Sequence, residues 1–270
     1  MGPNWVGITL TLITLLLISG TIVAHPYIKK VTNKYYFWLG IGVVLLIYVV
    51  LGRFQYNFRD FWNSNDKEGI TASKGLLLDL CPFVAFVLPI TLILDPTRKT
   101  SCVLAYYGIF GGIITFLGNF CVWNDFDSIN AKWDFQWIFL GDDMNRMYFM
   151  MHFILLFISP FVLLNSKRTW WLDISCCVGF ILMYFGYVLI CAHKFDVYSN
   201  ATGLVPGDWE LGGEYENVAS FLHLPYPWIV VVAYSLVTLL IISWIFLFWW
   251  LQKNKKYIYT YKINELFTLK

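Results

Sequence analysis

The stretch LLLDLCPFVAFVLPITLIL, residues 76–94, is an apolar run that carries an acid, a thiol and two prolines. Its length is close to the about 20 apolar residues that a helix needs to cross a bilayer. Asp79, Cys81 and Pro82 stand together near its start. An ionisable residue inside a membrane helix is costly, which makes it a candidate functional residue by default. The stretch therefore predicts a membrane protein and contains its first candidate functional residues.

The composition of the whole chain supports the same class of protein. Of the 270 residues, 59% are hydrophobic and only 13% are charged, whereas soluble domains have about 25% charged residues. So few charges cannot cover a soluble surface. The formal net charge of +2 gives no reason to expect a nucleic-acid partner.

Seven apolar runs divide the chain. We therefore expect an all-α membrane protein, a polytopic bundle of about seven transmembrane helices, with residues 1–270 forming a single membrane domain. The expected spans are 5–25, 36–52, 76–94, 102–123, 147–165, 169–192 and 227–251, and the longer loops are 53–75, 124–146 and 193–226.

The distribution of Lys and Arg predicts the orientation. The loops after the first, third and fifth spans, together with the C-terminal tail, hold 12 of these residues, and the other side holds 7. Loops rich in Lys and Arg stay on the cytoplasmic side of a membrane. We therefore expect a multi-pass protein of the cell membrane, with an external N-terminus, a cytoplasmic C-terminus and the three longer loops external.

Cys81 and His152 are expected at the same depth in the membrane. Each lies five residues into its span from the external end, or about 8 Å at the rise of an α-helix. A histidine is the usual group that takes the proton of a nucleophilic thiol. The pair predicts that Cys81 is a catalytic thiol that attacks the acyl ester of a membrane lipid, and that His152 is the base that takes its proton. The candidate substrate-binding residues at the external ends are Asp79, Asn119, His193 and His223.

These residues also have purely structural interpretations. Asp79 can pair with a basic loop residue, Cys81 can act as a small buried apolar residue, and His152 can hydrogen-bond a neighbouring helix. On a straight helix Asp79 lies about 200° away from Cys81. Asp79 is therefore expected to support a histidine from another helix and not to contact the thiol.

Cysteine and glycine spacing add two further expectations. The six cysteines include no CxxC pair, so neither a metal site nor a disulfide framework is expected. Gly108 and Gly112 form a GxxxG pair, which predicts close packing between helices. A homodimer contact through the Gly108/Gly112 face is the alternative.

Three motifs, in this order and spacing, resemble the YwaF-type bacterial integral membrane proteins. They are LLLDLCP (76–82), FMMHFILLFISPFVLLNSKRTWW (149–171) and LHLPYPWIVV (222–231). That family is related to a eukaryotic transmembrane phospholipid acyltransferase in which a cysteine and a histidine are the proposed catalytic pair. The resemblance implies this role for Cys81 and His152, membrane lipids as partners, a seven-span helical bundle and no soluble cofactor.

Three functions remain open from the sequence. The first is a membrane-embedded acyltransferase or lipid hydrolase that uses the Cys-His pair near the external leaflet. The second is a small-solute or ion transporter in which Asp79 and His152 bind a cation or a proton, although few polar residues are expected in the cytoplasmic halves of the spans. The third is an assembly or interaction protein without catalysis.

Overall fold

The computed structural model describes residues 5–65, 69–120, 131–142, 146–166, 169–196, 203–204, 206, 219–220 and 222–254. The regular elements in these ranges are helices, so the all-α prediction is confirmed for the described part of the chain. The elements are α1 (Trp5–Thr32), α2 (Tyr35–Val49), η1 (Val50–Phe54), α3 (Gln55–Asn63), α4 (Gly69–Gly75), α5 (Leu80–Leu94), α6 (Lys99–Thr115), η2 (Phe116–Phe120), α7 (Phe135–Leu140), α8 (Tyr148–Leu164), α9 (Trp170–Lys194) and α11 (Trp228–Lys253). The two segments η1 and η2 are single π-helical turns.

Six helices within the described residues are long and apolar enough to cross a membrane. Three of these helices are composite: Tyr35–Asn63 joins α2, η1 and α3, Thr71–Leu94 joins most of α4 to α5, and Lys99–Gly118 joins α6 to part of η2. The remaining apolar helix is α8, which has 17 residues. The chain therefore has the composition of a membrane protein.

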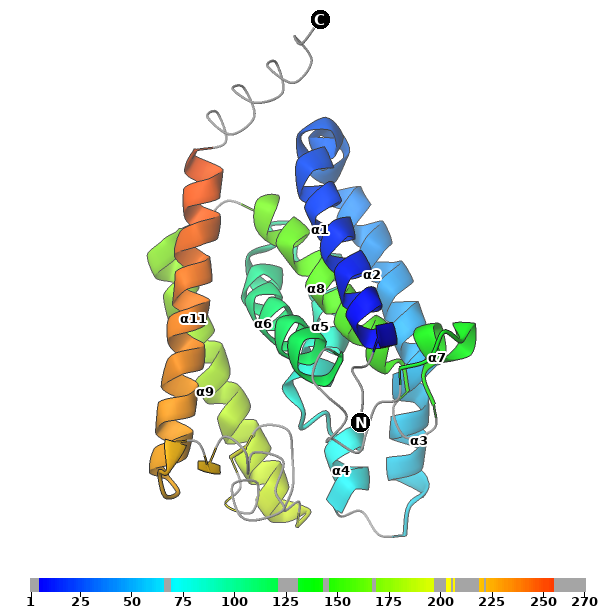
Figure 1. Cartoon of the computed structure of the whole chain (residues 1–270), viewed down its shortest axis with the longest axis vertical. Coiled ribbons are helices and arrows are strands. Elements are labelled where there is room, and N and C mark those ends of the chain that lie inside the picture. Colours follow the sequence, from blue (N-terminus) through cyan, green and yellow to red (C-terminus); the bar gives the residue numbers. More distant parts are fainter. Residues whose placement is uncertain are drawn as a thin grey trace, which may run out of the picture.

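Helix α6 lies at the centre of the bundle, packed against α5 on one side and α8 on another (Figure 1). Its apolar window is 72% buried, against 17% for α11. Gly112 allows the close contact with α8, because a Cβ there would lie 2.7 Å from the Leu156 Cβ. Gly108 of α6 faces Ser159 of α8. The close packing expected from the glycine pair is thus found inside the chain, and the homodimer stays a prediction.

Helices α9 and α11 lie side by side, on the opposite side of α6 from α1 and α2 (Figure 1). Both expose many large apolar side chains, including Met183 at 72% and Leu236 at 57%. A soluble protein buries such side chains, whereas lipid tails solvate them as well as a protein core does. The pair therefore has the surface of helices that face lipid.

Several helices extend beyond the expected spans. The first continues from residue 25 to Thr32, and the second continues through η1 and α3 to Asn63. The loop expected at 53–75 is therefore largely helical, and α7 lies within the loop expected at 124–146. Most of the loop expected at 193–226 lies outside the described residues.

Candidate functional site: a buried cluster around Arg53

The LLLDLCP segment is the break between α4 and α5 and not the first turns of a longer helix. Leu77 adopts a left-handed conformation with φ 56°, and the Leu78 N–H donates to the Ser73 carbonyl over 2.9 Å. Asp79 is extended (φ −89°, ψ 136°) and is the N-cap residue of α5. Pro82 falls in the first turn, where its missing N–H removes no helical hydrogen bond. The 200° separation expected between Asp79 and Cys81 therefore does not apply, because only Cys81 is inside the helix.

Two tyrosines of α9 hold this break in place. The Tyr184 hydroxyl donates to the Leu78 carbonyl over 2.8 Å, and the Tyr187 hydroxyl donates to the Leu76 carbonyl. The Tyr184 ring also packs on Phe83, with 5.0 Å between the centroids. These bonds satisfy carbonyl groups that the interrupted helix leaves without N–H partners. Helix α9 thus fixes the approach of the chain to Cys81.

The Cys81 thiol lies in the contact between α5 and α6. It is partly buried, and its Sγ atom points at Gly111 of α6, where any Cβ would collide with it. The next residue, Gly112, contacts Leu156 of α8, one turn beyond His152. The adjacent glycines therefore let α5 and α8 approach the same part of α6.

His152 is 3% exposed and its tautomer is set by the backbone of its own helix. The Nδ1 atom lies 2.7 Å from the Tyr148 carbonyl oxygen, and a carbonyl can only accept a hydrogen bond. Nδ1 therefore carries the proton of the neutral ring, which leaves the lone pair on Nε2. This tautomer is the one that a general base requires.

Arg53 is the functional candidate that the sequence analysis missed. It is only 8% exposed and lies in the π-helical turn η1, inside the apolar helix Tyr35–Asn63. An arginine inside a membrane helix is costly, by up to roughly 3 kcal/mol at the helix centre on insertion scales, and π-helical turns occur frequently at functional sites. The aromatic residues Phe54, Phe58 and Phe61, spaced as on one helix face, are the sequence signal that α2 continues past Arg53.

Arg53 connects the residues predicted from the sequence. Its Nη1 atom donates to the Arg146 carbonyl over 2.6 Å. Its charge interacts with Asp79 and Cys81 and reaches His152. The structure thus brings Asp79, Cys81 and His152 around one cation, and we call these four residues the Arg53 cluster. The Arg53 charge favours a thiolate, the nucleophilic form, at Cys81, whereas burial and the Asp79 charge oppose it.

The other predicted binding residues are not part of this cluster as the structure describes it. His193, near the end of α9, and His223, just before α11, are both exposed. Asn119 belongs to η2, but its side chain lies outside the described residues. In the part of the chain that is described, no three His, Cys, Asp or Glu side chains gather closely enough to hold a metal ion.

A second buried polar cluster lies at the opposite end of the bundle. The Asn165 side-chain oxygen accepts a hydrogen bond from Thr32 Oγ1 over 2.8 Å and lies 3.1 Å from His25 Nε2. The Asn165 backbone carbonyl accepts from Arg98 Nη2 over 2.9 Å. Gln252 of α11 donates to the carbonyl of Leu163. Few polar residues are expected from the sequence in these halves of the helices, so the Asn165 cluster is a second feature that the sequence does not predict.

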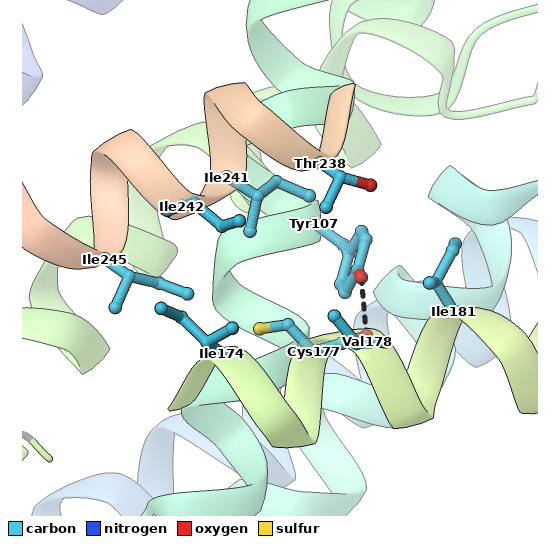
Figure 2. Close-up of a pocket in the computed structure, with 9 residues that line it drawn as sticks. All are labelled: Tyr107, Ile174, Cys177, Val178, Ile181, Thr238, Ile241, Ile242 and Ile245. Atoms are coloured by element: carbon cyan, nitrogen blue, oxygen red, sulfur yellow. Dashed lines mark hydrogen bonds between the residues drawn. The ribbon is translucent and has the colours of Figure 1, made fainter. Parts of the chain in front are cut away.

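A small cavity between α6, α9 and α11 is separate from both clusters (Figure 2). Its volume is about 10 Å³, which holds at most about one water. Figure 2 shows isoleucines of α9 and α11 around it, with the Tyr107 hydroxyl donating to the Cys177 carbonyl over 2.8 Å. A small-molecule site is larger, at about 300 Å³ or more, so we interpret this cavity as a packing gap.

The fold and the Arg53 cluster define an α-helical protein of membrane composition that buries a thiol, an imidazole and a guanidinium group together. The chain belongs to DUF5378, a family of unknown function whose model matches residues 10–270.

Two relatives come from mycoplasmas. The uncharacterized protein MG135 of Mycoplasma genitalium is 34% identical over 224 residues, which cover 79% of this chain and 78% of that protein. The MG135 homolog of Mycoplasma pneumoniae is 32% identical over 234 residues, covering 82% and 79%. No solved structure matches the chain. The resemblance to YwaF-type proteins stays a prediction.

Proposed function

We propose that the protein is a membrane-embedded enzyme that transfers or hydrolyses lipid acyl groups at the Arg53 cluster. One observation carries the proposal: the charge of a buried cation reaches both a thiol and a histidine whose Nε2 lone pair is available. Such charged groups are rare in membrane helices unless they serve a function.

In the proposed reaction His152 Nε2 takes the Cys81 proton, and the thiolate attacks the carbonyl carbon of a lipid ester. The C–O bond of the ester breaks and a thioester forms, while His152 returns the proton to the departing alkoxide. A lysolipid hydroxyl or a water then attacks the thioester and restores the thiol. Arg53 stabilises the thiolate and the developing oxyanion, and Asp79 holds Arg53 in position.

The proposal includes seven membrane spans: the six long helices and the shorter helix α8. The Arg53 cluster lies on the proposed external side. A helix of 17 residues is about 26 Å long, close to the about 30 Å of the hydrocarbon core. Without Arg53, which lies inside a long apolar helix, 6 Lys and Arg residues stand on the proposed external side, against 12 on the proposed cytoplasmic side. This difference supports an external N-terminus and a cytoplasmic C-terminus in the cell membrane.

The test is acyl transfer by the purified protein in liposomes that contain an acyl-labelled phospholipid and an unlabelled lysophospholipid. We expect label on the lysolipid or in free fatty acid, and a labelled acyl group on the Cys81 peptide by mass spectrometry. His152→Gln should lower the rate by about 100-fold or more, since a positioned base contributes at least that factor.

Cys81→Ser should abolish the covalent adduct, and Cys176→Ser, at an exposed position, is the matched control. Turnover that is unchanged in a correctly folded Cys81→Ser variant would rule the mechanism out.

A second candidate function, a proton- or ion-coupled transporter, is favoured by Ser159. Its hydroxyl is fully buried and has no hydrogen-bond partner among the described residues. It lies two turns from His152 on the same face of α8, between the Arg53 cluster and the Asn165 cluster. Proton uptake into liposomes that is lost in Ser159→Ala would support this function, and an absence of uptake in the wild type would exclude proton coupling.

A further inference from the structure

Two buried N–H donors beside the Arg53 cluster have no acceptor within the described residues. They are Arg53 Nε and Asn57 Nδ2. The residues are four positions apart, so their side chains leave the same face of the η1–α3 helix. A buried donor without an acceptor costs about 1–3 kcal/mol. Two of them on one face indicate a ligand that supplies acceptor oxygens.

The position of the Arg53 guanidinium group is fixed by its neighbours. Nη1 is held by the Arg146 carbonyl, and the Arg146 guanidinium group itself stacks on the Tyr56 ring at 4.0 Å from the centroid. Gly52 makes this possible, because any Cβ there would collide with Met147, the residue that follows Arg146. The orientation of the Arg53 guanidinium group, including its Nε edge, is therefore fixed by these contacts.

The charges around this edge favour an anion over a neutral acceptor. Lys74 of α4 lies close enough to Arg53 for the two cations to repel each other. Helix α4 is held against α3 at Gly75, which has no room for a side chain beside Phe61. Asp79 interacts with both cations, and Asp142 interacts with Lys74. Asp60, which also reaches Lys74, pairs with Arg59 over 3.0 Å.

We propose that Arg53 Nε, Asn57 Nδ2 and the Lys74 ammonium group bind a phosphate-type oxyanion beside Cys81. The anion is either the phosphodiester of a membrane lipid or free phosphate, since arginine binds both through paired N–H donors. As a statement about substrate, the inference rests on the proposed function and deepens it: the bound phosphate holds a lipid with its ester next to the thiol. As a statement about binding, it has a test of its own.

The test uses the Cys81→Ser variant, which cannot form a thioester, in neutral detergent. Native mass spectrometry measures the binding of phosphatidylglycerol against diacylglycerol with the same chains. We expect at least tenfold tighter binding of phosphatidylglycerol. The preference should disappear in Asn57→Leu and in Arg53→Lys, which keeps the charge but lacks Nε. Asn63→Leu, at an exposed position on the same helix, should retain it.

Competition by inorganic phosphate distinguishes the two sources of the anion. Displacement of the lipid at millimolar phosphate identifies free phosphate as a ligand of the site, whereas no displacement identifies the lipid headgroup. Equal binding of both lipids without any phosphate binding, or a preference that survives both Asn57→Leu and Arg53→Lys, overturns the inference. Binding without acyl transfer by the wild type would instead overturn the proposed function and leave the anion site in place.

Discussion

At the scale of single residues, Arg53 links the helices that carry the predicted site residues. The sequence places Cys81 and His152 at one depth but gives no link between their helices. Arg53 supplies that link from a third helix, through its charge and through the Arg146 carbonyl. From the sequence, Arg53 falls in a loop, because a charged residue after an apolar run ordinarily marks the end of a span.

Gly111→Ala tests the placement of the thiol. The added methyl group would occupy the position of Cys81 Sγ, and overpacking of this kind costs typically about 1–3 kcal/mol. We expect a lower midpoint of thermal unfolding in detergent and faster maleimide labelling of the Cys81 peptide, because the thiol is pushed out of the α5–α6 contact.

The control is Gly40→Ala, at a helical glycine with no other atoms within 4 Å. Alanine at such a position favours the helix by up to about 1 kcal/mol. We expect unchanged labelling there and equal or higher stability. Unchanged labelling and stability in Gly111→Ala would mean that Cys81 does not face α6.

At the scale of elements, interruptions of the helices place the functional groups. The break between α4 and α5 frees Asp79 from the helix, and the π-helical turn η1 carries Arg53. Hydropathy predicts where apolar helices lie, and it predicted α8, α9 and α11 to within a few residues. It cannot predict a left-handed Leu77 or a π-helical turn, because the contacts that stabilise them come from Tyr184 and Met147, which are distant in sequence.

The turn between α5 and α6 provides a test by pH. The Asp95 carboxylate accepts from Thr97 N–H over 2.9 Å and from Thr100 N–H over 2.8 Å. Partial burial alone would raise the pKa of Asp95, but these hydrogen bonds outweigh it and hold the pKa below its ordinary value. The stabilisation is therefore complete above the unfolded pKa of about 4 and is lost as the pH falls through the folded pKa.

We expect Asp95→Asn to be less stable than the wild type at pH 7, by about 1 kcal/mol, as is typical of a lost hydrogen bond. The amide nitrogen of asparagine cannot accept the Thr100 N–H. The difference in unfolding midpoint, measured by circular dichroism in detergent, should shrink as the pH falls below about 4. A constant difference from pH 7 to pH 3 would show that the charge of Asp95 does not stabilise the turn.

At the scale of the whole molecule, the two ends of the bundle differ in how their buried polar groups are hydrogen-bonded. Near the Arg53 cluster, Arg53 Nε and Asn57 Nδ2 lack acceptors among the described residues. At the other end, Asn165 uses its side-chain oxygen, its side-chain nitrogen and its backbone carbonyl, and of the described groups beside it only Arg98 Nε lacks an acceptor. Satisfied buried networks stabilise a unique arrangement, and unsatisfied groups mark sites for ligands. We therefore interpret the Asn165 cluster as the structural end of the bundle, at which α1, α8 and α11 are joined.

Asn165→Leu should destabilise the whole bundle. It removes the side-chain oxygen that accepts from Thr32 and lies beside His25 Nε2, at a cost of about 1–3 kcal/mol for each buried hydrogen bond that is lost. Asn33→Leu, at an exposed position near the same end, should change the stability by less than about 0.5 kcal/mol. Equal midpoints of thermal unfolding for the two variants would contradict a structural role for Asn165.

The tyrosine contacts at the α4–α5 break also have a consequence for the order of assembly. Tyr184 is 106 residues beyond Leu78, and Tyr187 is 111 beyond Leu76. At about 5–20 residues per second, a ribosome needs about 5–20 s to cover that distance. During this interval the Leu76 and Leu78 carbonyls lack their α9 donors, so the segment that leads to Cys81 takes its final shape only after α9 has entered the membrane. A nascent chain halted before α9 would already contain Cys81 and His152, yet the Cys81 thiol would not be in place.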